Sequence, residues 1–262
     1  MRGIVLEWKK EKRTGILPAF LGGGILAGAV PLANMAFRSE MYLKQYTPGM
    51  QVSRTPFAIL LDANWQMMAM LNMLLVVTGA CLLYHTEYAD NGLQKMRTLP
   101  LWEGTCFLGK TVLLFFLSLL LLAIEAGAIA FCAGHWFEGA MEGISAWLEL
   151  GLYFGYAFLR MVPCILLSLL VAEACRNMWI SLGIGVLCLF TATLLPAQVM
   201  SSGKIQFLAF FPFAMPFRMT TDMEGILENV AGGMWDLYAA VIWAAVLVLA
   251  GWLYRKGRRA WA

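Results

Sequence analysis

The chain is a series of long apolar runs separated by shorter polar segments. Four of these runs contain no charged residue, and two contain one each, Glu125 and Arg160. A bilayer core of about 30 Å is crossed by roughly 20 apolar residues of α-helix. Because the runs are continuous, they predict helices rather than the alternating strands of a membrane barrel. The predicted spans are residues 15–37, 63–84, 111–133, 150–172, 178–200 and 237–254.

Composition agrees with this pattern and excludes a water-soluble globule. Of the 262 residues, 61% are hydrophobic and 13% are charged, whereas soluble domains carry about 25% charged residues. These few charged residues cannot cover the surface of a water-soluble globule. Lipid must therefore solvate much of the apolar surface. The first run is long and lacks a small-residue cleavage site, which argues against a signal peptide. We therefore expect an all-α, polytopic membrane protein with six transmembrane helices and a single domain over residues 1–262.

The positive charges predict the orientation of these helices. Lysine and arginine concentrate in cytoplasmic loops of membrane proteins. With the N-terminus inside, the outer segments hold only Arg38, Lys44, Arg54, Lys204 and Arg218. The inner segments then hold Arg2, Lys9, Lys10, Lys12, Arg13, Lys95, Arg97, Lys110, Arg176, Arg255, Lys256, Arg258 and Arg259. Both termini are therefore expected in the cytoplasm.

Two cytoplasmic segments are expected to carry structure of their own. Residues 1–13 predict an interfacial helix, with Trp8 at the headgroups and the basic residues facing anionic lipid, although a simple positive anchor fits equally well. Residues 85–110 form the longest predicted cytoplasmic loop. In it, Asp90 or Asn91 can cap a short helix that Pro100 ends. Its alternation of apolar and charged residues is typical of a docking surface.

A strongly aromatic segment precedes the last span. Five phenylalanines and two prolines fall between Phe207 and Phe217, and such a run would be adhesive if exposed to water. We expect an extracellular re-entrant segment over about residues 203–233 that dips into the outer leaflet or packs across the tops of the spans. A sharper interpretation is a path for a hydrophobic substrate, formed by Phe210, Phe211, Pro212, Phe213, Pro216 and Phe217.

Glu125 and Arg160 are the two charges well inside predicted spans, where a charge costs about 2.5 kcal/mol or more. Counted at about 1.5 Å per residue, they lie roughly 21 and 18 Å from the cytoplasmic ends of the third and fourth spans. Adjacent antiparallel helices would bring them to one level. We predict a buried ion pair between them, with a polar gate or a substrate contact as the functional alternative.

No set of residues predicts catalysis, a bound cofactor or a metal site on this chain. Residues Gly104 to Thr111 match the phosphate-loop pattern G-x-x-x-x-G-K-[ST]. That motif requires a preceding buried strand and an α/β domain, whereas Thr111 opens a predicted span, so we interpret the match as a coincidence. The six cysteines are scattered singly, which favours packing residues over disulfides or zinc ligands. His85 and His135 are predicted on opposite sides of the membrane.

Three features resemble the small six-span permeases of type-2 ABC exporters, especially the lantibiotic and bacitracin self-immunity permeases. The stretch from Glu7 to Thr14 is similar to the acidic-then-basic entry to the first span. The aromatic and proline segment occupies the place of the family's extracellular re-entrant element. The cytoplasmic loop resembles the family pattern of a glutamate, a glycine, a leucine–proline step and a lysine, here Glu87, Gly92, Leu93, Leu99, Pro100, Leu101 and Lys110.

The resemblance implies a transport subunit rather than an enzyme. In that family a separate ABC ATPase subunit binds ATP and magnesium, and the loop after the second span docks into it as a coupling helix. The implied docking residues are Glu87, Leu93, Lys95, Arg97, Leu99, Pro100 and Leu101.

The resemblance also implies the assembly and the cargo. Two permeases, identical or related, would enclose a path in a bacterial cell membrane and export an amphipathic peptide antibiotic. Alternatives are an exporter of lipid-like molecules or drugs, or a membrane scaffold or channel. A secondary transporter is disfavoured because the predicted ion pair leaves no spare proton or sodium site.

Overall fold

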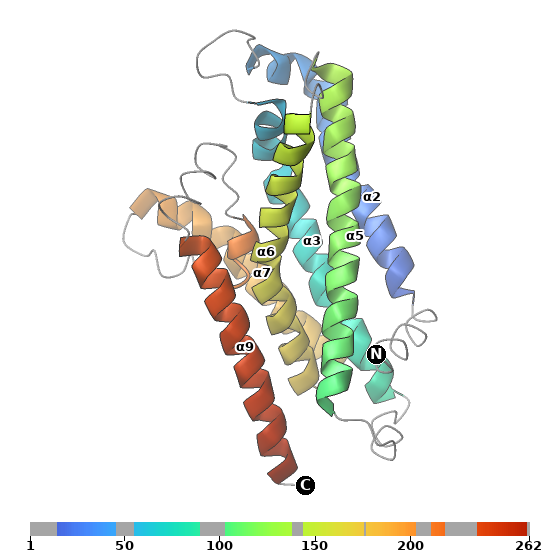
Figure 1. Ribbon diagram of the computed structural model, residues 1–262, viewed down its shortest axis with the longest axis vertical. Helices are drawn as coiled ribbons and strands as arrows, with labels where there is room; N and C mark the ends of the chain where they lie inside the picture. Colours follow the sequence, from blue (N-terminus) through green and yellow to red (C-terminus); the bar gives the residue numbers. More distant parts are fainter. Residues whose placement is uncertain are drawn as a thin grey trace.

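The computed structural model describes residues 15–45, 55–89, 103–137, 144–175, 177–202, 211–217 and 235–260. These residues form six long helices and one 3₁₀ turn, and no strand occurs among them (Figure 1). The elements are α2 (Ile16–Gln45), α3 (Pro56–Ala89), α5 (Glu103–Trp136), α6 (Ile144–Ala174), α7 (Met178–Ser202), η2 (Met215–Phe217) and α9 (Trp235–Ala260).

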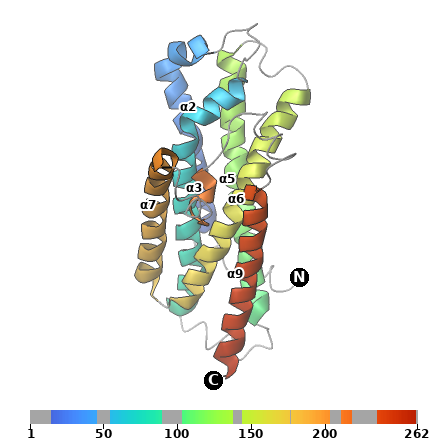
Figure 2. The ribbon, with the colours of Figure 1, turned by 90° about the vertical axis from the view of Figure 1, so that its left-hand side faces the viewer.

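The helices run alternately up and down in one bundle. The ends of α3, α6 and α9 lie toward the bottom of Figure 1, where α5 begins. α3 and α6 are central: α3 packs against α2, α5, α6 and α7, while α6 packs against α3, α5, α7 and α9. α7 and α9 flank the bundle on opposite sides in Figure 2. The η2 turn contacts α3, α6 and α7, so it lies inside the bundle.

Five of the helices are long and apolar enough to cross a membrane. They comprise Ile16–Lys44, Pro56–Thr86, Cys106–Trp136, Ile144–Ala174 and Leu237–Gly257. The apolar part of α7, Met178–Leu194, is shorter than these five helices. The expectation of a polytopic all-helical protein is therefore confirmed for the described residues, with five spans supported by length and composition. The sixth span stays a prediction, and residues 1–13 lie outside the described residues.

Several helices extend beyond the apolar runs that predict them. Residues 85–89 complete α3 and residues 103–110 begin α5, so the segment between these helices is 90–102 rather than 85–110. Counting apolar residues measures the lipid core, whereas a helix continues through the interface. The upper end of α3 is set by Thr55, whose hydroxyl accepts a hydrogen bond from the Ala58 amide at 3.3 Å, with proline at the first helical position.

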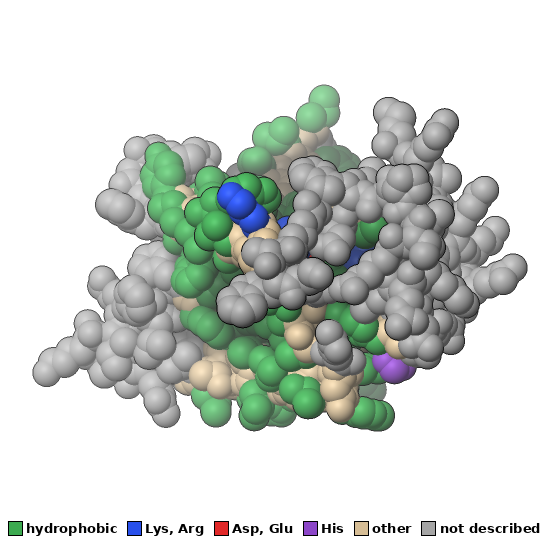
Figure 3. Space-filling model, turned by 90° about the horizontal axis from the view of Figure 1, so that it is seen from below, with side chains coloured by type: hydrophobic (Ala, Val, Ile, Leu, Met, Phe, Trp, Pro, Cys, Tyr) green, Lys and Arg blue, Asp and Glu red, His purple; other side chains and the backbone are tan. Residues whose placement is uncertain are grey.

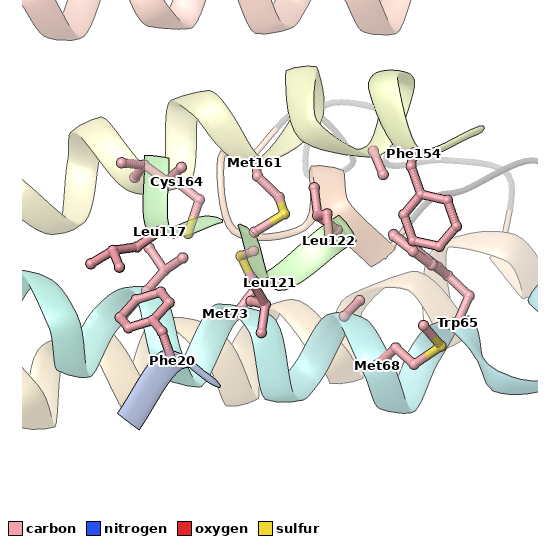
Figure 4. Close-up of a cluster of buried hydrophobic side chains, with 14 of the residues drawn as sticks. Phe20, Trp65, Met68, Met73, Leu117, Leu121, Leu122, Phe154, Met161 and Cys164 are labelled. Atoms are coloured by element: carbon pink, nitrogen blue, oxygen red, sulfur yellow. The ribbon is translucent and has the colours of Figure 1, made fainter. Parts of the chain in front are cut away.

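The core is filled by side chains from α2, α3, α5, α6 and α7, and Figure 4 shows part of it. Phe20 of α2, Met73 of α3, Leu121 of α5 and Met161 of α6 meet in one buried cluster. Nearer the upper end, the rings of Trp65 and Phe154 meet edge to face with centroids 6.3 Å apart. The core holds α3 and α6 side by side, which fixes the spacing of their lower ends.

Candidate functional site

The lower end of the bundle, where α3 ends and α5 begins, is called here the loop end. It carries both attachment points of segment 90–102. Viewed from this end, the described surface shows hydrophobic side chains with lysine and arginine among them (Figure 3). Two groups of buried contacts lie here, one around Lys110 and one around Glu173.

The first group joins the end of α3 to the start of α5. Lys110 is 1% exposed, and its ammonium lies over the Tyr84 ring, 4.9 Å from the centroid. Tyr84 in turn stacks on Tyr88, with centroids 6.4 Å apart. A cation desolvated against an aromatic face gains attraction from the ring quadrupole. The two helices that lead into and out of segment 90–102 are therefore fastened to each other.

The second group centres on Glu173 at the end of α6. The Tyr88 hydroxyl donates a hydrogen bond to the Glu173 backbone carbonyl at 2.9 Å, which satisfies one of the terminal carbonyls of α6. Arg255 of α9 pairs with the Glu173 carboxylate at 3.0 Å. The Arg255 guanidinium also lies over the Phe107 ring of α5, 4.1 Å from its centroid. Four helices thus converge at one ion pair.

The phosphate-loop pattern is helical in the structure. Residues Gly104 to Thr111 lie in the first two turns of α5, and the Thr111 hydroxyl donates to the Phe107 carbonyl at 2.9 Å. A phosphate loop needs backbone amides that point away from a helix into an anion site. Lys110 is instead buried on Tyr84. This geometry favours the interpretation of the match as a coincidence.

Most of the predicted docking residues lie outside the described residues. These are Leu93, Lys95, Arg97, Leu99, Pro100 and Leu101. The backbone of Glu87 belongs to the last turn of α3, but its side chain is also outside the description. The docking surface therefore stays a prediction, whereas the helices on both sides of it are placed.

The hydrogen bonds described for Glu125 and Arg160 are to other residues, and a direct ion pair between the two stays a prediction. Asn72 of α3 donates a hydrogen bond to the Glu125 carboxylate at 3.0 Å. Arg160 donates to the Tyr156 hydroxyl at 2.6 Å, one turn earlier on α6. Both charges are fully buried. Depth counting predicts their level along the bundle, but it does not predict the face of the helix from which each side chain projects.

The described part of the aromatic segment, residues 211–217, is buried inside the bundle. Pro212, Phe213 and Pro216 are buried, whereas Phe211 and Phe217 are partly buried. The Trp65 indole donates to the Pro216 carbonyl at 2.7 Å, which anchors the segment to α3. Phe210 lies outside the described residues. The segment therefore packs between α3, α6 and α7.

Two hollows accompany this arrangement. A cavity of about 120 Å³ lies between α3, α6 and α7, and Phe211 and Phe213 form part of its wall. A wider groove of about 590 Å³ lies between α5 and α6, with Gly127 and Gly151 among its small residues and Phe131 and Trp147 among its aromatic ones. Both hollows are lined mainly by apolar atoms, so they suit hydrophobic groups.

Sequence reasoning missed the contacts of Glu173, Arg255 and Phe107. Glu173 counts as part of a short loop in the hydropathy pattern, and Arg255 counts as one of several tail cations. One available signal is their position, because each lies within two turns of a predicted cytoplasmic helix end. Which cation pairs with the Glu173 carboxylate depends on the packing of α9 against α6, and the hydropathy pattern does not predict that packing.

The comparison with protein families decides the class of this bundle. The family model of the ABC-2 family transporter proteins matches residues 3–192. The chain belongs to this family. It is accordingly a multi-pass membrane permease subunit of an ABC transporter, a transport subunit whose partner is an ABC ATPase. The comparison with curated proteins gives no match.

Proposed function

We propose that this ABC-2 permease exports an amphipathic peptide antibiotic of the lantibiotic or bacitracin type and so protects the cell that makes it. A second permease, identical or related, completes the path, and two ATPase subunits hold ATP and magnesium. The chain itself binds no nucleotide. It lies in a bacterial cell membrane, crosses it six times with α7 as the fifth span, and keeps both termini in the cytoplasm.

The observation that carries the proposal is the joining of the two helices that flank segment 90–102 at the loop end. Lys110, Tyr84 and Tyr88 join its two flanking helices, and Glu173 and Arg255 join these helices to α6 and α9. A segment attached in this way transmits force to the bundle when an ATPase subunit moves it. Among the described residues, Lys110, Arg255 and Lys256 belong to this end and Arg38 and Lys44 to the opposite one, and this small excess supports a cytoplasmic orientation of the loop end.

The hollows support a hydrophobic cargo. The groove between α5 and α6 and the cavity beside Phe213 are lined mainly by apolar atoms, and an amphipathic peptide partitions into lipid before it is exported. An exporter of lipid-like molecules or drugs shares this feature and is the second candidate. The cargo assay below separates the two.

The experiment places aspartate at Leu93, Leu99 and Leu101 together and measures how much ABC ATPase copurifies with the permease. We expect loss of the ATPase, because three buried carboxylates would replace the apolar docking side chains. Met41→Asp is the control, since Met41 is exposed at the opposite end of the bundle. Unchanged copurification of the triple variant would contradict the docking role.

The cargo is tested in a sensitive bacterium that expresses the permease with its ATPase. We expect the minimum inhibitory concentration of nisin or bacitracin to rise, while that of a small lipophilic dye stays constant. Protection against the dye alone would favour the second candidate over the peptide.

A further inference from the structure

Arg255 connects three helices that are otherwise joined in pairs. Its guanidinium pairs with Glu173 of α6 at 3.0 Å and lies over Phe107 of α5 at 4.1 Å. Glu173 is itself connected to α3, because its backbone carbonyl accepts the Tyr88 hydroxyl. Both helices that flank segment 90–102 therefore have a contact at this ion pair or its immediate neighbours, in addition to their packing on α6 along the bundle.

Two properties of the Arg255 and Glu173 side chains favour this contact. The side chains of Arg255 and Glu173 are 12% and 10% exposed, so the pair is shielded from the solvent that weakens surface ion pairs. Arginine can pair with a carboxylate and stack on an aromatic ring at the same time, because its guanidinium is planar, whereas a lysine ammonium cannot. Replacement of Arg255 by lysine would retain the charge and lose the stacking.

Gly251 permits the close approach of α9 and α6 one turn before Arg255. A Cβ at this position would lie 2.7 Å from Leu170 Cδ2 of α6 and 3.1 Å from Arg255 Nη2. A side chain here would have to displace the ends of the Leu170 and Arg255 side chains and would so disturb the guanidinium. The helix surface and the ion pair are thus matched to each other.

Elsewhere α9 packs on α6 through apolar contacts, and Ala240 and Leu247 of α9 are buried. Its large side chains Val241, Ile242, Val248 and Leu249 are exposed on the bundle surface, where lipid surrounds them. A nearly buried ion pair costs desolvation energy and is weak evidence of stability, but it fixes one arrangement.

We propose that Arg255 and Glu173 are positioning residues that join α9 and α6 to the helices flanking segment 90–102, so that ATP-driven movement of that segment is transmitted to the bundle. This inference rests on the proposed function, in which the segment docks into the ATPase. α6 then carries the movement onward, because it contacts α3, α5, α7 and the buried η2 turn.

The test measures a distance in the assembled complex rather than stability. Nitroxide labels replace Trp179 of α7 and Leu253 of α9, both exposed, through an unnatural amino acid because the chain has six native cysteines. The permease is reconstituted with its ABC ATPase, and the label distance is measured without nucleotide and after trapping with ATP, magnesium and vanadate. Arg255→Gln, Glu173→Gln and the exchanged pair Glu173→Arg with Arg255→Glu are compared, with Lys256→Gln as the matched control.

We expect each single variant to reduce the trapped shift by about half or more while the ATPase stays bound. The exchanged pair should recover most of the shift, and Lys256→Gln should match the unsubstituted chain, since Lys256 lies over Trp252 instead. A full shift in both single variants would overturn the inference, as would loss of the bound ATPase from them, because the pair would then serve docking.

Two further outcomes keep the inference apart from the proposed function. If the glutamine variants fail to fold, Arg255→Lys decides, because it retains the charge and loses the stacking on Phe107 that links α9 to α5. A shift equal to that of the unsubstituted chain would then overturn the inference. If the unsubstituted complex shows no shift with ATP, the proposed role of segment 90–102 is wrong, and the inference falls with it. A normal shift in the unsubstituted complex and in the single variants overturns the inference alone.

Discussion

The amide of Asn72 donates a hydrogen bond to the Glu125 carboxylate across 3.0 Å, joining α3 to α5 inside the bundle. Both side chains are fully buried. Intramembrane polar residues that face the bundle interior hold helices together, since they have no water to bind instead. The described hydrogen-bond partner of Glu125 is therefore a neutral amide on another helix.

Asn72→Leu should destabilise the bundle by about 1–3 kcal/mol, because a buried carboxyl group loses its hydrogen bond. The measurement is thermal unfolding of the purified chain in detergent. Thr78→Val is the control on the same helix, since the Thr78 hydroxyl bonds only to carbonyls of its own α3 in the described contacts. Equal unfolding temperatures for the two variants would show that the Asn72 bond contributes nothing.

Exchanging the charges of Glu125 and Arg160 should not restore what either single reversal loses. The reason is that the two side chains have separate hydrogen-bond partners, Asn72 for Glu125 and Tyr156 for Arg160. The yield of folded permease in the membrane is compared for Glu125→Arg, Arg160→Glu and the double variant. Recovery of the double variant to the level of the unsubstituted chain would show that the two residues form a direct ion pair.

Gly185→Ala should be damaging, whereas Gly183→Ala should be tolerated. A Cβ at Gly185 would lie 2.3 Å from Val77 Cγ1 of α3, while a Cβ at Gly183 meets nothing within 4 Å. We expect a cost of about 1–3 kcal/mol for Gly185→Ala from overpacking, measured by thermal unfolding. Adding Val77→Ala should recover part of it. No difference between the two alanine variants would contradict the close packing of α7 on α3.

Trp65→Phe should loosen the buried 211–217 segment, because it removes the indole that donates to the Pro216 carbonyl at 2.7 Å. The expected loss is about 1 kcal/mol, the value of one hydrogen bond. Trp147→Phe is the control, since Trp147 is an exposed residue of the α5–α6 groove. Unfolding temperatures that fall equally in both variants would argue against the anchor.

The fold class could be predicted from the sequence because hydrophobicity dominates it. All six apolar runs coincide with helices, and the helices extend further than the runs because an apolar run measures only the lipid core. The pattern also predicts that the Phe- and Pro-rich segment avoids water. Its position between α3, α6 and α7 depends on the Trp65 hydrogen bond and on helix neighbours, which hydropathy does not contain.

Side-chain pairing could not be predicted for the same reason. The pattern identifies Glu125 and Arg160 as buried, and the structure confirms their burial. The hydrogen-bond partners Asn72 and Tyr156 are uncharged, so a search for charged residues does not identify them. At the loop end, the pair of Glu173 and Arg255 joins residues 82 positions apart, and only the packing of α9 against α6 brings them together.

The central claim, that segment 90–102 docks into the ABC ATPase, is tested most directly by photo-crosslinking in membranes. A photoreactive amino acid is placed at Leu99, and a second chain carries it at Met41, which is exposed at the opposite end of the bundle. The account predicts a crosslink to the ATPase subunit from position 99 and none from position 41. A crosslink to the ATPase from position 41 with none from position 99 would contradict it.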